Sequence, residues 1–193
     1  MQIELVILEG EFIRLEPLRI EHLENFWKVG ADETLWRWTA NVVENKNDLR
    51  RYVETALDEQ RRGVSLPFVT IEKAENKIVG STRFGNIDAK NRRAEIGWTW
   101  INPKWQRTRV NTEAKFLMLT HAFETWNCIR VELKTDALNE KSRNAILRLG
   151  AKEEGIFRQH LITETGRIRD TVYFSILDSE WKNVKENLDK KLR

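Results

Sequence analysis

The sequence predicts an α+β protein whose central sheet is mostly antiparallel, contains one parallel pair of strands and carries helices on both faces. Two observations support this fold class. Residues 78–87 and 94–101 are typical of strands, and the turn Asp88-Ala89-Lys90-Asn91 between them indicates a hairpin. Residues 111–126 then show the strongest helical pattern of the chain, and residues 130–135 alternate as a strand. A strand, a crossover helix and a second strand make the two strands parallel.

The remaining elements flank this unit. A first strand is expected within 12–18, and helices within 21–29 and 48–62, where Gly63 is the predicted C-cap. Both faces of Ala94–Ile101 carry apolar residues, which predicts a central strand. The other expected elements are a strand over 67–71, a helix over 140–149, strands over 151–158 and 167–176, and a helix over 178–192.

The composition is typical of a single globular domain over residues 1–193, because 40% of residues are hydrophobic and 33% are charged. Cys128 is the only cysteine, so no internal disulfide is expected and a cytoplasmic location is favoured. No segment resembles a signal peptide or a membrane span. The net charge of +3 argues only weakly for a nucleic-acid partner. The absence of a G-x-G-x-x-G motif argues against a nicotinamide dehydrogenase, and three histidines without ligand spacing predict no metal: His22, His121 and His160.

The segment between the central strand and the strongest helix is the predicted binding loop. The N-terminus of a helix offers free N–H groups and a positive dipole end, which suit a pyrophosphate. Arg107 and Arg109 add positive charge there. The alternative is an ordinary exposed loop with Asn111 or Thr112 as the N-cap. The predicted binding residues are Trp105, Gln106, Arg107, Thr108, Arg109, Val110, Asn111 and Thr112.

The chain resembles the GCN5-related N-acetyltransferase (GNAT) superfamily, and within it the ribosomal-protein alanine N-acetyltransferase-like branch. The resemblance covers nearly the whole length. It lies in Arg14-Leu15-Glu16-Pro17-Leu18, Glu21-His22-Leu23, Ala94-Glu95-Ile96-Gly97-Trp98, Asn139-Glu140-Lys141-Ser142, Arg148 to Gly155, and the closing segment from Asp170 to Trp181. It implies acetyl-CoA as cosubstrate, and an acceptor that is a primary amine of a protein N-terminus, such as a ribosomal protein, or of a small molecule. Homodimers are common among such relatives.

The pyrophosphate loop departs from the pattern of this family, which reads Gln/Arg-x-x-Gly-x-Gly/Ala. Gln106 matches, whereas Arg109 and Asn111 stand at the two small positions. Glycine permits a positive φ and a close approach of the backbone, which arginine does not. Either the charge of Arg109 compensates, which we favour, or CoA binding is weakened. Weakened binding would fit a second function, that of a non-catalytic acyl-CoA-binding regulatory module.

The resemblance implies direct attack of the amine on the thioester, which needs a proton acceptor, an oxyanion donor and an acid for the thiolate. Ser142 is the predicted acid, since Ile146 stands where many relatives have tyrosine; the alternative is a serine that caps its helix. The oxyanion donor falls at the backbone of Trp100 or Ile101. Asn139 either contacts the pantetheine arm or caps the same helix.

Glu95 is the predicted general base, because a carboxylate inside an apolar central strand can be tuned for proton transfer. The alternative is a structural ion pair with Arg83 or Arg93. Trp36, Arg37 and Trp38 lie between the first two predicted helices and are the predicted walls of the acceptor cleft, where Arg37 would recognise a carboxylate. The alternative for these three is packing with a solvated charge.

Overall fold

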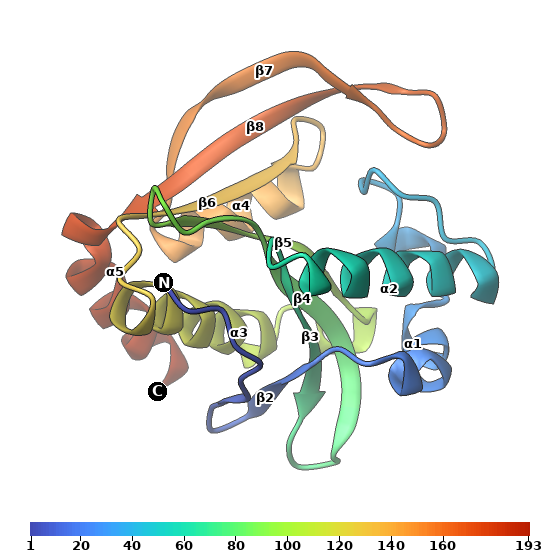
Figure 1. Cartoon of the computed structure of the whole chain (residues 1–193), viewed down its shortest axis with the longest axis horizontal. Coiled ribbons are helices and arrows are strands. Elements are labelled where there is room, and N and C mark those ends of the chain that lie inside the picture. Colours follow the sequence, from blue (N-terminus) through green and yellow to red (C-terminus); the bar gives the residue numbers. More distant parts are fainter.

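Eight strands form one sheet in the order β1-β2-β3-β4-β5-β6-β8-β7 in the computed structural model, which describes all of residues 1–193 (Figure 1). All neighbouring strands are antiparallel except β5 and β6, which confirms the predicted fold class. The strands are β1 Leu8–Glu9, β2 Ile13–Pro17, β3 Leu66–Glu72, β4 Lys77–Asp88, β5 Arg93–Ile101, β6 Arg130–Asp136, β7 Lys152–Ile162 and β8 Ile168–Leu177.

Helices cover both faces of the sheet because successive side chains of a strand point to opposite sides. On β3, Val69 and Ile71 pack with one buried cluster that includes residues of α1 and α2. Phe68 packs with the larger cluster, which includes residues of α3 and α5. The helices are α1 Leu23–Gly30, α2 Lys46–Arg61, α3 Arg109–Thr120, α4 Glu140–Leu149 and α5 Asp178–Leu192; short helical turns are η1 Ile20–His22, η2 Glu33–Leu35, η3 Pro103–Trp105 and the π-turn η4 His121–Thr125.

The beginning of α3 corrects one prediction. The helix begins at Arg109, and its N-cap is Thr108, whose hydroxyl accepts a hydrogen bond from the amide of Val110 at 3.3 Å. Neither Asn111 nor Thr112 is the cap. Val110 is the only apolar residue in the first helical turn. The apolar periodicity therefore does not show that the helix begins at Arg109. No helix of the structure is both long and apolar enough to span a bilayer.

Candidate functional site

Strands β5 and β6 pair over only three residues and then diverge. Arg93, Ala94 and Glu95 lie opposite Arg130, Val131 and Glu132. Beyond this point β5 continues to Ile101 without a partner from β6, while the rest of β6 pairs only with β8. Backbone N–H and C=O groups left without a strand partner need other hydrogen-bonding groups. The gap between the two strands is therefore suited to an extended ligand.

A β-bulge reshapes the free part of β5. Ser81 lies opposite Trp100 and Arg83 opposite Gly97, so β5 has one residue more than β4 in this interval. The bulged residue Trp98 has a φ of 48°, which is a strained value for a bulky side chain. Its ring occupies the space that a Cβ on Gly85 would fill. Backbone strain of this kind concentrates at functional sites, and Thr99, the residue after Trp98, is exposed.

The loop before α3 lies at the open end of this gap. The Gln106 side chain donates to the carbonyl of Ile101 at 3.0 Å, and the Thr108 hydroxyl donates to the carbonyl of Trp105 at 2.7 Å. Gln106, Arg107 and Thr108 are exposed. The loop thus delivers the N-terminus of a twelve-residue helix to the place where the strands diverge. A helix start of this kind is an anion site.

The left-handed residue of this loop is Arg107, with a φ of 61°. Arg109 is the first residue of α3, so its backbone is right-handed and needs no glycine. The Arg109 guanidinium lies 4.7 Å from the ring of Phe12 and donates to the carbonyl of Arg193 at 3.3 Å. Val110 is buried in the core, so only its backbone is free to meet a ligand. Asn111 is half-buried with an Oδ1 that has no hydrogen-bond partner, and Thr112 is also half-buried.

Helix α4 carries Ser142 and its capping residue. Asn139 Oδ1 accepts a hydrogen bond from the amide of Ser142 at 3.1 Å, so the predicted capping role of Asn139 is confirmed. Ser142 is half-buried, on the same side of the helix as the buried Ile146 and Leu149. The contacts of Asn139 with a pantetheine arm and of Ser142 with a thiolate stay predictions.

Glu95 lies at the point where β5 and β6 separate, and it is 5% exposed. Its carboxylate pairs with Lys134 Nζ at 2.6 Å and accepts a hydrogen bond from the side-chain amide of Asn86 at 2.6 Å. The alternative interpretation, a structural ion pair of Glu95, is therefore found, with Lys134 as the partner in place of Arg83 or Arg93. Arg83 pairs with Glu59, and Arg93 pairs with Asp88 and Glu132. Lys134 escaped prediction because it lies far away in sequence, and only the parallel register of β6 brings it close. The role of Glu95 as a base stays a prediction.

Comparison with known proteins places this architecture in one family. The acetyltransferase (GNAT) domain model matches residues 13–152, which include the diverging strands and the loop before α3. The chain belongs to the GNAT acetyltransferase family. It is an N-acetyltransferase of a family that uses acetyl-CoA.

Relatives of this acetyltransferase cover almost its whole length. It is 32% identical over 174 residues to YdaF of Bacillus subtilis (strain 168), named provisionally as a ribosomal N-acetyltransferase, with 89% of this chain and 92% of the relative covered. It is 22% identical to the ribosomal-protein-serine acetyltransferase of Escherichia coli (strain K12), with 89% and 96% covered. The crystal structure of a GCN5-related N-acetyltransferase from Brucella melitensis matches with 32% identity and a TM-score of 0.92, covering 99% of this chain and 87% of the other.

The acetyltransferase has a cleft of about 740 Å³ between the segment that joins α1 to α2 and the turn between β7 and β8. Trp36 and Arg37 line it, together with Thr163 and Arg167. Trp36 is buried, and its indole N–H donates to the carbonyl of Gly30 at 2.8 Å. The packing alternative therefore holds for Trp36, which still contributes one edge to the cleft.

Trp38 lies between two arginines. The guanidinium carbons of Arg37 and Arg167 lie 5.0 Å and 5.6 Å from its ring centroid. Trp38 itself is not among the residues that line the cleft. Arg167 in turn pairs with the buried carboxylate of Asp136, at the free end of β6. Arg37 and Arg167 line this cleft together with the acidic residues Asp32, Glu33 and Glu44, so its lining carries charges of both signs.

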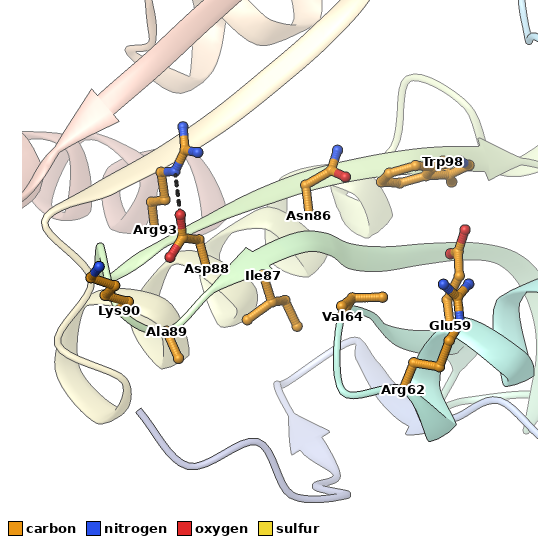
Figure 2. A pocket seen from close by; sticks show the side chains of 10 residues that line it. All are labelled: Glu59, Arg62, Val64, Asn86, Ile87, Asp88, Ala89, Lys90, Arg93 and Trp98. Carbon is orange, nitrogen blue, oxygen red and sulfur yellow. Dashed lines mark hydrogen bonds and ion pairs between the residues drawn. The ribbon is translucent and has the colours of Figure 1, made fainter.

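A second cavity, of about 730 Å³, lies beside the β4–β5 hairpin. Figure 2 shows that it runs from Trp98 to the ion pair between Arg93 and Asp88, whose Nε and Oδ2 are 3.3 Å apart. The end of α2 provides its far wall with Glu59 and Arg62. None of the predicted site residues lines this cavity. The candidate site is the gap between β5 and β6, with the cleft that Trp36 and Arg37 line.

Three residues near the gap were missed in the sequence: Lys115, Thr82 and Thr99. The Lys115 ammonium is buried and lies within hydrogen-bond distance of both threonine hydroxyls. Spacing in the helix contained a signal for Lys115, since it stands three residues before Met118 and four before Leu119, on the buried stripe. No comparable pattern marks the threonines, because their position depends on the bulge.

Proposed function

We propose that this acetyltransferase transfers the acetyl group of acetyl-CoA to a primary amine by direct attack of the amine on the thioester. One observation carries the proposal. The edge of β5 that faces β6 has no strand partner from Ile96 to Ile101, and it leads to the exposed N-terminus of α3. An extended pantetheine arm fits such an edge by hydrogen bonds, and a pyrophosphate fits such a helix start.

The residues proposed to hold acetyl-CoA follow this path. The backbone of Trp100 and Ile101 would bind the acyl and pantetheine portion, with Asn139 and Ser142 on the opposite side. The positively charged loop would bind the phosphates. Arg107 is the better candidate for a direct phosphate contact, because the Arg109 guanidinium is engaged by Phe12 and Arg193. The loop residues in this proposal are Trp105, Gln106, Arg107, Thr108, Arg109, Val110, Asn111 and Thr112.

The chemistry requires that the amine lose a proton and that the thiolate be stabilised. Glu95 remains the proposed acceptor of the proton, although its carboxylate must first exchange some of its contact with Lys134. A backbone N–H near Trp100 would stabilise the developing oxyanion. Ser142 is proposed to donate a hydrogen bond to sulfur, and its hydroxyl has no competing partner recorded in the structure.

The acceptor is proposed to enter through the cleft beside Trp36. The names of the relatives from Bacillus subtilis and Escherichia coli support a protein N-terminus, with a ribosomal protein as first choice. Arg37 is the proposed contact for a carboxylate near the amine of the acceptor, because the guanidinium of Arg167 already pairs with Asp136. We also expect a cytoplasmic enzyme, and a homodimer is a further hypothesis.

The test measures CoA release in the presence of a panel of amines, and a thiol reagent detects the CoA that is released. Burial raises the pKa of Cys128 to about 11, so this cysteine contributes little thiolate to the background. We expect turnover with peptide N-termini, and a fall of about 100-fold in kcat for Ser142→Ala with little change in the KM of acetyl-CoA. A peptide whose second residue is Asp or Glu should be turned over faster than the same peptide with Asn or Gln at that position. No release with any amine, despite calorimetric binding of acetyl-CoA, would instead support a non-catalytic acyl-CoA-binding module.

A further inference from the structure

A lysine side chain is buried beneath the part of β5 that does not pair with β6. Lys115, on α3, is 5% exposed. Its Nζ lies 2.6 Å from the hydroxyl of Thr99 and 2.9 Å from that of Thr82. The two hydroxyls are 2.8 Å apart, and Thr99 also donates to the carbonyl of Gly97 at 3.3 Å. The ammonium is thus connected to the exposed threonine of the bulge.

No carboxylate neutralises this lysine. Burial alone lowers the pKa of Lys115 to about 7, with no contribution from any charged group. The other polar neighbours of Thr82 are uncharged, namely the carbonyl of Gly97 at 3.5 Å and the sulfur of Met118 at 3.6 Å. Ionisable side chains on neighbouring strands and on α3 have other partners: Arg83 pairs with Glu59, Glu95 pairs with Lys134, and Glu113 accepts from the amide of Ile13. The ring of His121 packs against Trp126. A lysine in such surroundings costs stability, and this cost is not offset by any ion pair.

The position of Lys115 relates it to CoA rather than to the acceptor. It belongs to α3, six residues beyond Arg109, or ~9 Å along the helix axis from the proposed phosphate site. Trp36 and Trp100 pack together in the cluster on the other face of the sheet. Thr99 is exposed on the part of β5 that has no partner in β6, where the pantetheine arm is proposed to pass, and its hydroxyl contacts the buried ammonium.

We propose that Lys115 and Thr99 form a proton-donating pair on the CoA side of the gap, which stabilises and protonates the departing thiolate. This inference rests on the proposed function. In this proposal the Thr99 hydroxyl donates the proton to sulfur, and Lys115 supplies the positive charge. Ser142 is left with a hydrogen bond that holds the sulfur in place.

The proposed step is balanced. The amine nitrogen forms a bond to the carbonyl carbon, the carbon–sulfur bond breaks, and the electron pair stays on sulfur. Thr99 gives its hydroxyl proton to sulfur while Lys115 gives a proton to the Thr99 oxygen. CoA leaves as a thiol and Lys115 is left neutral. The proton released by the attacking amine, or one from water, restores the ammonium. A donor with a pKa near 7 is well matched to a thiolate whose conjugate acid has a pKa of roughly 8.5.

The experiment compares four variants with the wild type: Lys115→Met, Thr99→Val, Thr99→Ser and Met118→Leu. The single-turnover rate constant is measured at saturating acetyl-CoA and saturating peptide amine, from about pH 6 to about pH 9. We expect the wild-type rate constant to fall above about pH 7, as Lys115 loses its proton. Lys115→Met and Thr99→Val should be slower by about 100-fold and lack this descending limb.

The remaining variants separate chemistry from packing. Thr99→Ser keeps the hydroxyl and should retain the descending limb that Thr99→Val lacks. Met118→Leu changes only the packing beside Thr82 and should stay within about threefold of the wild type. A Lys115→Met protein with an unchanged rate constant, or with a lower rate constant and the same descending limb, would overturn the role of this pair. A wild type that binds acetyl-CoA without turnover with any amine would count against the proposed function instead.

Discussion

The carboxylate of Glu164 accepts a hydrogen bond from the backbone amide of Val42 at 2.6 Å. The Asn41 side chain donates to the same carboxylate at 3.2 Å, and the Glu164 amide donates to the carbonyl of Ala40 at 3.0 Å. The turn between β7 and β8 is thereby joined to the segment between α1 and α2, and Figure 1 shows the long hairpin reaching over the sheet toward that segment. These contacts close one side of the proposed acceptor cleft.

Removing this carboxylate should loosen the acceptor site and spare the CoA site. For Glu164→Ala we expect the KM of the amine to rise about 3- to 10-fold, since an exposed hydrogen bond to a charged group contributes about 1 kcal/mol. The KM of acetyl-CoA should stay unchanged. Steady-state kinetics with each substrate varied in turn gives both constants. Glu164→Gln retains an acceptor oxygen and serves as the matched control with a smaller effect. Equal increases in both KM values would contradict a local role.

A second prediction concerns the anchoring of α3. The Glu113 carboxylate is 3% exposed and accepts hydrogen bonds from the backbone amides of Glu11, Phe12 and Ile13 at 2.8, 2.9 and 2.7 Å. Glu113→Gln would place an amide N–H₂ against backbone donors. We expect the free energy of unfolding to fall by about 2–4 kcal/mol, because buried donors would lose a charged acceptor. Urea denaturation measures the change.

Gly10 tests the same contact from the other side. A Cβ on Gly10 would lie 2.4 Å from the carboxyl carbon of Glu113, so Gly10→Ala must displace that carboxylate. We expect Gly10→Ala to be destabilising, and the double variant with Glu113→Gln to lose less than the sum of the two single changes. Additive losses would show that the residues act independently.

The ion pair of Glu95 and Lys134 permits a test of the catalytic assignment. Although burial acts to lower the pKa of Lys134, the Glu95 carboxylate and Tyr173 raise it above its ordinary value. Glu95→Gln leaves a partly buried ammonium without its partner, so we expect a loss of about 3 kcal/mol in the free energy of unfolding. Replacing both residues, as in Glu95→Gln with Lys134→Met, should restore most of this stability. If Glu95 is the base, kcat stays low in the double variant; a recovered kcat would assign Glu95 a structural role.

The sequence was sufficient for the elements and their order. The parallel pair followed from the strand–helix–strand pattern of residues 94–135, and α4 and α5 have the predicted bounds. Alternation and helical periodicity are local properties, so they can be read without a structure. The N-cap Thr108 and the two-residue strand β1 were missed because neither carries an apolar repeat.

The side-chain partners of the site could not be predicted in the same way. Lys134 meets Glu95 only because β5 and β6 are in register. Lys115 meets Thr99 only because the bulge at Trp98 turns that hydroxyl toward α3. The positive φ falls on Arg107, two residues before the position where the family pattern has glycine. These relationships arise from tertiary geometry between distant residues.

The two arginines of the loop should differ in their effects on CoA. Arg107 is exposed, whereas the Arg109 guanidinium contacts Phe12 and the Arg193 carbonyl. We therefore expect Arg107→Ala to weaken acetyl-CoA binding about 10-fold and Arg109→Ala by less than about threefold, since a single phosphate contact by a guanidinium is worth about 1.5 kcal/mol. Calorimetry at two salt concentrations gives the dissociation constants. A reversed order would assign the phosphate contact to Arg109.

The buried ammonium of Lys115 should also be visible in stability. Its pKa is about 7 in the folded protein, whereas an unfolded lysine has a pKa of about 10.4. Between these values the unfolded chain binds more protons than the folded chain, so the free energy of unfolding rises with pH, by up to about 1.4 kcal/mol per pH unit. Lys115→Met removes this dependence. The variant should therefore exceed the wild type in stability at pH 7, and the difference should shrink as the pH approaches 9.5.

Urea denaturation of the two proteins at several pH values measures this difference directly, because the other titrating groups are shared and cancel. Met118→Leu, which changes packing beside Thr82 without changing charge, should show a pH-independent difference from the wild type. A pH-independent difference for Lys115→Met as well would mean that the folded and unfolded chains protonate this lysine alike. In that case the hydroxyls of Thr82 and Thr99 would hold a permanent ammonium, and the descending limb of the rate profile would have to arise from another group.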